Sequence, residues 1–138
     1  MSVPDFIDSN ILVYAYDVTD PAKQQAAQAL IRKAVAGGFV ISTQVLAEFA
    51  ATLLHKVVPT PSSETVVSLL DALAPIPLIT PDGDMVRRAV EARDSYGLHF
   101  YDGMIVAAAE KAGCERIWSE DLNAGQEYFG VKVANPFQ

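Results

Sequence analysis

The sequence predicts a single domain over residues 1–138 with an α/β fold: a three-layer α/β/α arrangement in which helices cover both faces of a central, mainly parallel sheet. Two observations carry this prediction. Short apolar segments alternate along the chain with longer amphipathic segments, which is the pattern of parallel β–α–β units. No linker, repeat or low-complexity segment divides the 138 residues, and that length is usual for one domain.

The first half of the chain supplies two strands and three helices. In the stretch from Pro4 to Tyr16, a short buried strand ends at Asp8 and turns directly into a helix. Asp20-Pro21 begins a helix over 22–35, because Pro is favoured at an early helical position, and two glycines end it. A buried strand at 39–41 follows, and then a helix over 44–57 that Ser42 or Thr43 can cap.

The second half continues the alternation. Two prolines break the preceding helix, and a further helix begins at Ser62 or Ser63 and extends to about 73. A strand is predicted at 76–80, then helices over 82–96 and 101–112, of which the last is stopped by Gly113. Strands at 116–119 and 131–134 complete the expected sheet.

Composition excludes several classes of protein. The chain is 51% hydrophobic, but no apolar run approaches the roughly 18 residues that a membrane span needs, so no membrane partner is expected. Asp5 and Asp8 interrupt the only apolar stretch near the N-terminus, which argues against a signal peptide. The single cysteine, Cys114, excludes an internal disulfide, suits a buried thiol, and indicates a reducing, cytoplasmic setting.

The net charge of −7 argues against a protein that binds nucleic acid through bulk positive charge. The same charge is compatible with a metal-dependent enzyme. Carboxylates that converge on divalent cations are not ordinary surface charges, and the cations reverse the local sign of the site. Such an enzyme meets phosphate through its metals.

Acidic residues follow two of the predicted strands. Asp8 comes directly after the first strand with Ser9 and Asn10 behind it, at the strand end where ligands gather in open α/β sheets. The alternative is that Asp8 only caps the following helix. Glu120 and Asp121 come just past the strand at 116–119, and because they are adjacent, at most one of them is expected to face the same site.

The helix over 44–57 carries a narrow polar strip on an otherwise apolar surface, formed by Gln44, Glu48, Thr52 and His55. The strip faces either a polar site or solvent, and in the second case Glu48 is an ordinary surface acid.

Asp102 shares a helix face with Val106 and Ala109, so its carboxylate needs a partner or a cation, unless it is the helix N-cap. His99 has no suitably spaced histidine partner and is expected to be structural.

The predicted topology brings four carboxylates to one edge of the sheet, from Asp8, Glu48, Asp102 and Asp121. Like charges that lie this close raise one another's pKa values, and a hard cation such as Mg²⁺ or Mn²⁺ removes the repulsion. The chemistry that follows is metal-assisted hydrolysis, with a phosphodiester as the expected substrate.

Taken in order, these residues match a known family. Asp8-x-Asn10 follows the first strand, Glu48 lies in the third helix, and two motifs follow, Tyr101-Asp102-Gly103-Met104-Ile105-Val106-Ala107-Ala108-Ala109 and Ser119-Glu120-Asp121-Leu122. Over nearly the whole chain the sequence resembles the PIN-domain ribonucleases, and among these the VapC-type toxins of bacterial toxin–antitoxin pairs.

The resemblance implies site residues one by one. The metal-binding and catalytic acids of the family fall on Asp8, Glu48, Asp102 and Asp121, and its small polar residues fall on Asn10 and Ser119. Gly103 stands where Ala is more usual, a departure that is expected to be harmless. Whether Glu120 contributes to the metal site stays open.

The resemblance also implies activity and partners. The expected protein is an endoribonuclease that depends on Mg²⁺ or Mn²⁺, cleaves structured RNA such as tRNA or rRNA, forms a homodimer, and is neutralised by a small antitoxin that covers the active-site groove. The apolar segment 45–79 folds back on itself through Pro59 and Pro61, which makes it a candidate antitoxin or dimer contact. An ordinary core hairpin explains its composition equally well.

Other functions remain open at the level of sequence. A housekeeping PIN-domain nuclease that processes RNA is hardly separable from a toxin. A non-enzymatic α/β binding domain requires the four acids to be unrelated caps and surface charges. A phosphatase of the HAD type is disfavoured because Asn10 stands where a second Asp is needed. Four basic residues are candidate phosphate contacts or simply parts of a charged helix surface, namely Lys56, Arg87, Arg88 and Arg93.

Overall fold

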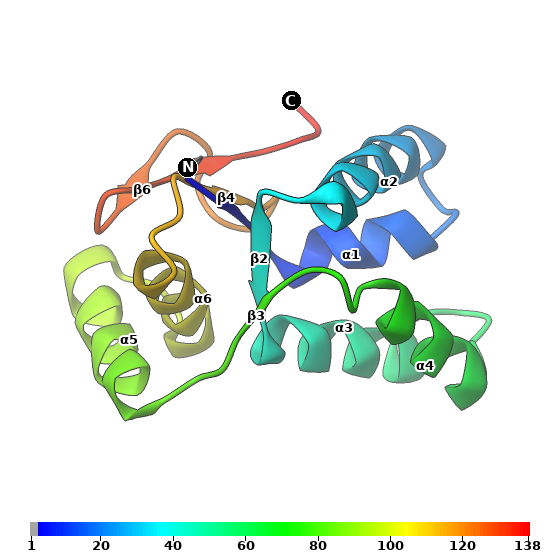
Figure 1. The fold of residues 1–138 in the computed structure, drawn as a ribbon, viewed down its shortest axis with the longest axis horizontal. Helices are drawn as coiled ribbons and strands as arrows, with labels where there is room; N and C mark the ends of the chain where they lie inside the picture. Colours follow the sequence, from blue (N-terminus) through cyan, green and yellow to red (C-terminus); the bar gives the residue numbers. More distant parts are fainter. Residues whose placement is uncertain (1–2) are drawn as a thin grey trace.

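The computed structural model describes residues 3–138 and has the predicted three-layer architecture (Figure 1). Its six-stranded sheet has the order β3-β2-β1-β4-β6-β5, and every neighbouring pair is parallel except β5 and β6. The strands are β1 (Asp5–Ile7), β2 (Phe39–Ser42), β3 (Leu78–Ile79), β4 (Arg116–Trp118), β5 (Glu127–Tyr128) and β6 (Val131–Ala134). The helices are α1 (Ser9–Tyr16), α2 (Pro21–Ala36), α3 (Thr43–His55), α4 (Ser63–Ala72), α5 (Gly83–Tyr96) and α6 (Phe100–Lys111).

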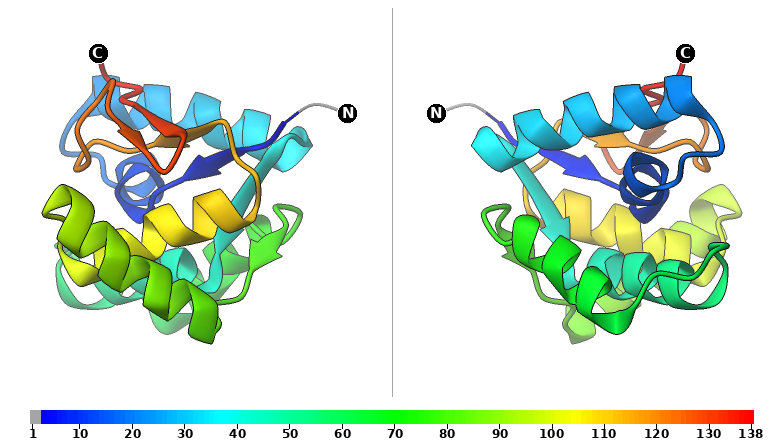
Figure 2. Two further views of the ribbon diagram at one scale, coloured as in Figure 1. Left: turned by 90° about the vertical axis from the view of Figure 1, so that its left-hand side faces the viewer. Right: turned by 90° about the vertical axis from the view of Figure 1, so that its right-hand side faces the viewer.

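The helices form three packed pairs around the sheet. Figure 2 shows β1 between α2 on one face of the sheet and α6 on the other. The helix α5 packs along α6, and α1 packs along α2 (Figure 1). The helix α3 continues directly from β2, and α4 packs against it. All three residues of β1 are buried, as expected for a central parallel strand that is covered on both faces.

Most element boundaries agree with the sequence prediction because they are set by local capping. The hydroxyl of Ser42 accepts a hydrogen bond from the Val45 N–H (3.2 Å) and caps α3, and the hydroxyl of Ser62 caps α4 in the same way. Asp20 caps α2 just before Pro21, as its position in the sequence indicates. No helix in residues 3–138 is long and apolar enough to cross a membrane.

The strand β5 is missing from the sequence prediction. It pairs antiparallel with β6 through a two-residue turn in which both Phe129 (φ 50°) and Gly130 (φ 84°) have positive φ. Asn-Gly or Asp-Gly is the usual sequence of such a turn, so Phe129 gives no signal. The Phe129 N–H donates to the hydroxyl of Tyr96 (3.0 Å), and the guanidinium of Arg88 lies 3.5 Å from the ring centroid, so tertiary contacts support this backbone.

Gly103 has a packing role that its place in the motif does not reveal. A Cβ atom at this position would lie 2.7 Å from the carbonyl oxygen of Ala89 on α5, which is closer than real Cβ contacts. Gly103 therefore allows α5 and α6 to approach one another more closely than Ala would.

Candidate active site

The carboxyl ends of β1 and β4 form the crevice in which the acidic residues gather. From β1 the sheet extends to β2 on one side and to β4 on the other, so the chain order changes direction at this point. Crevices at such switch points are where ligands bind in parallel α/β sheets. The Asp8 N–H donates to the Trp118 carbonyl (3.0 Å), so Asp8 and Ser119 emerge from adjacent strands.

Asp8 is both a helix cap and a buried member of the crevice. Its side chain is 4% exposed, and Oδ1 accepts from the Ser9 N–H at the start of α1 (2.7 Å). Its Oδ2 accepts from the Ser119 hydroxyl (2.9 Å) and lies 3.2 Å from the Asn10 amide nitrogen. Burial raises the pKa of Asp8 to about 6, although the hydrogen bonds from Ser119 and Ser9 oppose the shift, and the nearby carboxylate of Glu48 adds to it.

Asn10 connects the first motif with the last. Besides Asp8, its amide nitrogen lies within hydrogen-bond distance of the Ser119 hydroxyl (3.3 Å) and of Asp121 Oδ2 (3.2 Å). Its Oδ1 accepts from the Glu120 N–H (3.1 Å). The hydroxyl of Ser119, which is fully buried, accepts from the Asp121 N–H (3.2 Å). Asn10 and Ser119 therefore fix the distance between Asp8 and Asp121.

Glu48 reaches the same edge from α3. It is half-buried, and its Oε1 accepts from the Ser9 hydroxyl (3.3 Å). Burial raises its pKa, and the carboxylates of Asp102 and Asp121 raise it further. Glu48 is half-buried and the carboxylates of Asp102 and Asp121 act on it, so its position fits the crevice better than an isolated surface acid.

Asp102 lies in the first turn of α6 and is not its cap. The cap is His99, whose Nδ1 accepts from the Tyr101 N–H (3.2 Å). Asp102 is half-buried, and its pKa is raised first by burial and then by the carboxylate of Asp121. The Gln44 amide donates to the Tyr101 carbonyl (3.1 Å), which holds the start of α3 against the start of α6.

Neighbouring carboxylates thus raise the pKa values of Asp8, Glu48 and Asp102 at one edge of the sheet, but the acids do not enclose a finished metal site. No group of three or more His, Cys, Asp and Glu side chains within residues 3–138 is close enough to hold an ion by itself. Mg²⁺ usually keeps several waters and takes only one or two carboxylates, together with substrate phosphate. A set of donors made of carboxylate, amide and hydroxyl oxygens fits such a hard, hydrated cation.

Glu120 points away from this cluster. Its carboxylate accepts from the Tyr14 hydroxyl (2.5 Å) and from the Lys23 ammonium (2.6 Å). The ammonium also lies 4.9 Å from the centroid of the Tyr14 ring. Of the two adjacent carboxylates, that of Asp121 lies within hydrogen-bond distance of Asn10 in the crevice, in agreement with the prediction that at most one of them faces the site. Tyr14 follows Asn10 by one helical turn, a spacing that was available in the sequence, whereas nothing in the sequence marks Lys23.

A cleft of about 340 Å³ extends from the crevice along α1 and the end of α3. It is lined by Ser9, Asn10, Val13, Tyr14, Asp17, Thr52, Lys56, Glu120 and Asp121. The polar strip of α3 was predicted to comprise Gln44, Glu48, Thr52 and His55. After Thr52, the polar residue that lines the cleft is Lys56 and not His55. Lys56 follows Thr52 by four residues and His55 follows it by three, and the four-residue step stays closer to the same helix face.

Carboxylates in such a crevice, on a mainly parallel sheet covered by helices, are a common setting for divalent metal ions and for the hydrolysis of phosphate esters. The sequence pattern of the PIN domain matches residues 6–126, and the chain belongs to the PIN domain family. None of the curated proteins compared with this chain matches it.

Solved structures similar to this chain include components of toxin–antitoxin systems. A chain of a toxin–antitoxin complex from Klebsiella pneumoniae has a TM-score of 0.65 and 21% identity, and the match covers 96% of this chain and 97% of that one. A chain of VapBC2 from Rickettsia felis, bound to a DNA fragment from its promoter, has a TM-score of 0.67 and 17% identity, with 96% and 98% covered. VapC20 from Mycobacterium tuberculosis, a toxin that cleaves the sarcin–ricin loop, has a TM-score of 0.65 and 17% identity, with 85% and 89% covered.

Proposed function

We propose that this protein is an endoribonuclease that depends on Mg²⁺ or Mn²⁺ and acts in the cytoplasm as the toxin of a toxin–antitoxin pair. The observation that carries the proposal is the gathering of Asp8, Glu48, Asp102 and Asp121 at one edge of the sheet. Asn10 lies within hydrogen-bond distance of both Asp8 and Asp121. The carboxylates of Asp102 and Asp121 raise the pKa of Glu48. Membership of the PIN domain family supports the nuclease activity, and the similarity to toxin chains supports the biological role.

The four acids have the role of metal ligands and catalytic residues in this proposal. When it is bound, a divalent ion supplies an activated water and stabilises the charge that develops on the phosphodiester. Asn10 and Ser119 keep Asp8 and Asp121 at a fixed separation through the hydrogen bonds that join them. Burial and neighbouring acids raise the pKa of Asp8 to about 6, so the cluster takes up either protons or cations when it is assembled.

The proposed substrate is structured RNA, such as tRNA or rRNA. Cleavage of the sarcin–ricin loop by VapC20 supports this class of substrate, although the two chains are only 17% identical. With a net charge of −7, the protein does not attract RNA through its overall charge. In this proposal, bound metal ions therefore contribute to binding of the RNA phosphates.

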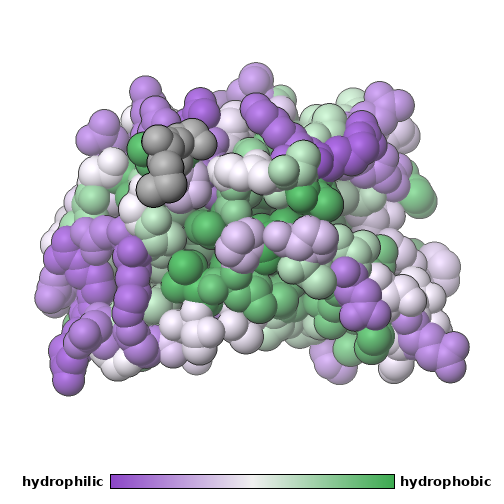
Figure 3. Space-filling model, in the orientation of Figure 1, coloured by the Kyte–Doolittle hydropathy of each residue, from purple (hydrophilic) through white to green (hydrophobic). Residues whose placement is uncertain are grey.

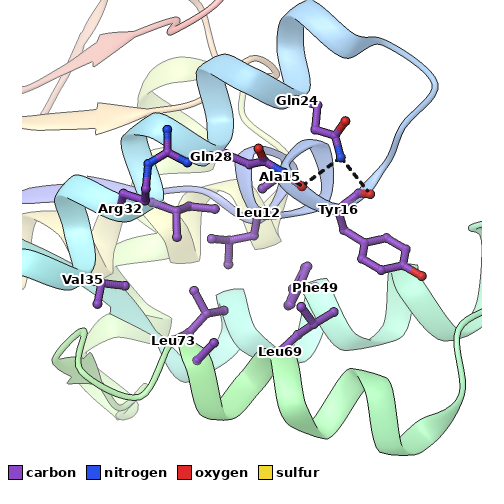
Figure 4. A pocket seen from close by; sticks show the side chains of 12 residues that line it. Leu12, Ala15, Tyr16, Gln24, Gln28, Arg32, Val35, Phe49, Leu69 and Leu73 are labelled. Atoms are coloured by element: carbon purple, nitrogen blue, oxygen red, sulfur yellow. Dashed lines mark hydrogen bonds between the residues drawn. The ribbon is translucent and has the colours of Figure 1, made fainter.

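The proposed antitoxin contact is an apolar groove between the α1–α2 pair and the α3–α4 pair. The groove has a volume of about 570 Å³ and is lined by Leu12, Ala15, Tyr16, Gln24, Gln28, Ile31, Arg32, Val35, Phe49, Leu69, Ala72 and Leu73. Figure 3 shows hydrophobic residues across the middle of one face of the molecule, with hydrophilic residues around them. In Figure 4, Leu12 of α1, Leu69 of α4 and Leu73, the C-cap of α4, point into the space between the helix pairs.

The proposed occupant of this groove is an amphipathic helix of the antitoxin whose apolar side fills it. Two features support this occupant. The amides of Gln24 and Gln28 donate to the Ala15 carbonyl (3.4 and 3.0 Å), so the polar groups at the groove wall are already paired. Arg32 is exposed at the margin and suits an acidic residue of the partner. The predicted contact segment, 45–79, forms one wall, although Val45, Phe49, Leu53 and Val66 within it are core residues.

A substitution at an exposed position of the groove tests this contact. Ala72→Arg adds a long charged side chain at the wall, and Val67→Arg adds the same side chain on the opposite face of α4, outside the lining. We expect Ala72→Arg to stay toxic when it is co-expressed with its antitoxin, and Val67→Arg to be neutralised like the wild type. Neutralisation of both variants contradicts the groove as the contact. Sedimentation of the isolated chain tests the proposed homodimer.

The central experiment is incubation of the purified protein with total RNA, with Mg²⁺, Mn²⁺ or EDTA, followed by mapping of the new RNA ends. Cleavage at defined positions is expected with either metal, and none is expected with EDTA or with the Asp102→Asn variant. Undiminished cleavage after full chelation contradicts the metal-dependent mechanism. Normal growth of cells that contain the active enzyme without an antitoxin favours a housekeeping nuclease over a toxin.

A further inference from the structure

The cleft beside the acidic crevice has one basic residue, and its position gives it a part in substrate binding. The chain has 10 Lys and Arg residues, all within the described residues. Six of them form ion pairs with Asp or Glu, at Lys23, Arg87, Arg88, Arg93, Lys111 and Arg116. Within residues 3–138, the four without such a pair are Arg32, Lys33, Lys56 and Lys132. Among these four, Lys56 alone lines the cleft.

The structure also separates Lys56 from the other basic residues that the sequence offered as phosphate contacts. Arg87 pairs with Asp84 (2.7 Å), and Arg93 pairs with Asp94 (3.2 Å). Arg88 donates to both carboxylate oxygens of Glu110 (2.8 Å each). These three arginines lie on α5, and none of them lines the cleft. The three arginines are therefore parts of a charged helix surface, and Lys56 is left as the candidate phosphate contact.

We propose that Lys56 binds a backbone phosphate of the RNA beside the phosphodiester that is cleaved, and that the cleft carries this neighbouring segment of the substrate. The proposal rests on the proposed ribonuclease function. Lys56 is the C-cap of α3, where its N–H donates to the Thr52 carbonyl (2.9 Å), so its backbone is fixed while its side chain is exposed.

The separation from Glu48 suits a neighbouring phosphate and not the cleaved one. Lys56 is the C-cap of α3, two helical turns beyond Glu48, which corresponds to roughly 12 Å along the helix axis. That distance exceeds the Debye length of about 8 Å at physiological ionic strength, so the ammonium is largely screened from Glu48. Val13 and Tyr14 give the wall between these points an apolar surface against which a ribose or base packs.

The wall of the cleft needs a cation for RNA to enter it. Asp17, Glu120 and Asp121 also line the cleft and repel phosphate. Lys23 compensates the charge of Glu120 directly (2.6 Å), and Asp17 accepts from the hydroxyl of Thr19 (2.6 Å). Lys56 is then the side chain at the wall that is free to pair with an incoming phosphate.

The test compares Lys56→Gln with Lys33→Gln as a matched control. Both residues are exposed lysines at the C-terminal end of a helix, so both substitutions remove the same charge from the same kind of helix position. Steady-state cleavage of a fluorescent RNA that carries the mapped cut site is measured at several salt concentrations. A third variant, Lys56→Arg, keeps the charge.

For Lys56→Gln we expect KM to rise roughly threefold to tenfold with kcat within about twofold of the wild type, since one exposed phosphate contact is lost. The slope of log(kcat/KM) against log[salt] should become shallower by about 0.7, which is the contribution of one phosphate contact on single-stranded nucleic acid. Lys33→Gln and Lys56→Arg should match the wild type.

Failure of this inference and failure of the proposed function give different results. Cleavage by Lys56→Gln with unchanged KM and unchanged salt slope overturns the role of Lys56 while the ribonuclease function stands. An equal rise of KM in Lys33→Gln also overturns the role of Lys56, because the effect is then due to the change in net charge and not to a specific contact. If the wild type cleaves no RNA, the proposed function fails, and the role of Lys56 is then tested by RNA binding, measured by fluorescence anisotropy. Equal RNA affinity of wild type and Lys56→Gln, or no RNA binding by either, overturns the proposed phosphate contact.

Discussion

Substitution of Asp8 by Asn separates a catalytic carboxylate from a helix cap, because Asn caps a helix about as well as Asp. Burial raises the pKa of Asp8 from 3.8 in the unfolded chain to about 6 in the folded protein. The folded state therefore favours the protonated carboxyl. Its stabilising contribution is fully present below the unfolded pKa and is lost as the pH rises through about 6.

The magnitude follows from that shift of about two pKa units. At roughly 1.4 kcal/mol for each unit, an ionised Asp8 costs about 3 kcal/mol of folding free energy at pH 8 without metal. The Asp8→Asn variant avoids this cost but loses one acceptor toward Ser119 and Asn10, which costs about 1–2 kcal/mol. The net gain of Asp8→Asn at pH 8 is therefore about 1–2 kcal/mol, or roughly 3–8 °C in Tm.

At pH 5 the carboxyl of Asp8 is mostly protonated in the folded state but still ionised in the unfolded chain, so about half of the cost remains. The gain and the loss of Asp8→Asn then nearly cancel, and the variant should melt close to the wild type. The assay is thermal unfolding of both proteins in EDTA at pH 5 and pH 8, and then at pH 8 with Mg²⁺. Mg²⁺ should raise the Tm of the wild type, by an amount that corresponds to about 2.7 kcal/mol at one hundred times Kd, and should raise that of Asp8→Asn far less.

The control is Asp71→Asn, the same change at an exposed position of α4 away from the crevice, where surface substitution should leave the stability within about 0.5 kcal/mol. A Tm difference between Asp8→Asn and wild type that stays constant from pH 5 to pH 8 refutes the electrostatic reasoning. Equal stabilisation of both proteins by Mg²⁺, together with RNA cleavage at the wild-type rate, refutes the role of Asp8 as a ligand.

Three further predictions follow from particular contacts. Gly103→Ala should lower Tm by the equivalent of about 1–3 kcal/mol, because the new methyl group meets the Ala89 carbonyl. The cleavage rate of each folded molecule should stay within about twofold of the wild-type rate. An unchanged Tm contradicts the close packing of α5 on α6. Glu120→Gln should destabilise the protein by about 1 kcal/mol, because the ion pair with Lys23 is lost. It should weaken Mg²⁺ binding only severalfold, whereas Asp121→Asn should weaken Mg²⁺ binding by orders of magnitude. Equal losses of Mg²⁺ affinity in the two variants, measured by calorimetry, would make Glu120 a ligand. The rise in Tm that Mg²⁺ causes should shrink below about pH 6, because protons compete for Asp8; a rise that is independent of pH from 5 to 8 would exclude Asp8 from the metal site.

The sequence by itself predicted the fold class and, except for β5, the elements in their order, and it marked the four acids of the proposed site. Helix starts at Asp8, Asp20, Ser42 and Ser62 depend on side-chain oxygens that bond the next few backbone N–H groups, and such interactions are local in the chain. The strands β1, β2, β4 and β6 were visible as apolar runs for the same reason. Acids directly after β1 and β4 could be placed at one sheet edge because parallel strands share a carboxyl end.

Tertiary structure alone decided what depends on contacts between residues that are distant in sequence. Asp102 was compatible with capping or with the crevice, and the cap at His99 together with the hydrogen bond from Gln44 to the Tyr101 carbonyl placed Asp102 among the other acids. Glu120 and Asp121 are neighbours in the chain, and Lys23, almost a hundred residues away, determines which of them leaves the crevice.

The same holds for packing and for the cleft. A Phe at a turn position gave no local signal for β5, because its conformation depends on Tyr96 and Arg88 of α5. Lys56 was one of several exposed basic residues until the ion pairs of the others were known. Local propensity and periodicity fix where an element begins and which side is apolar, whereas the partner of a charged side chain is fixed only when the packed fold brings the two together.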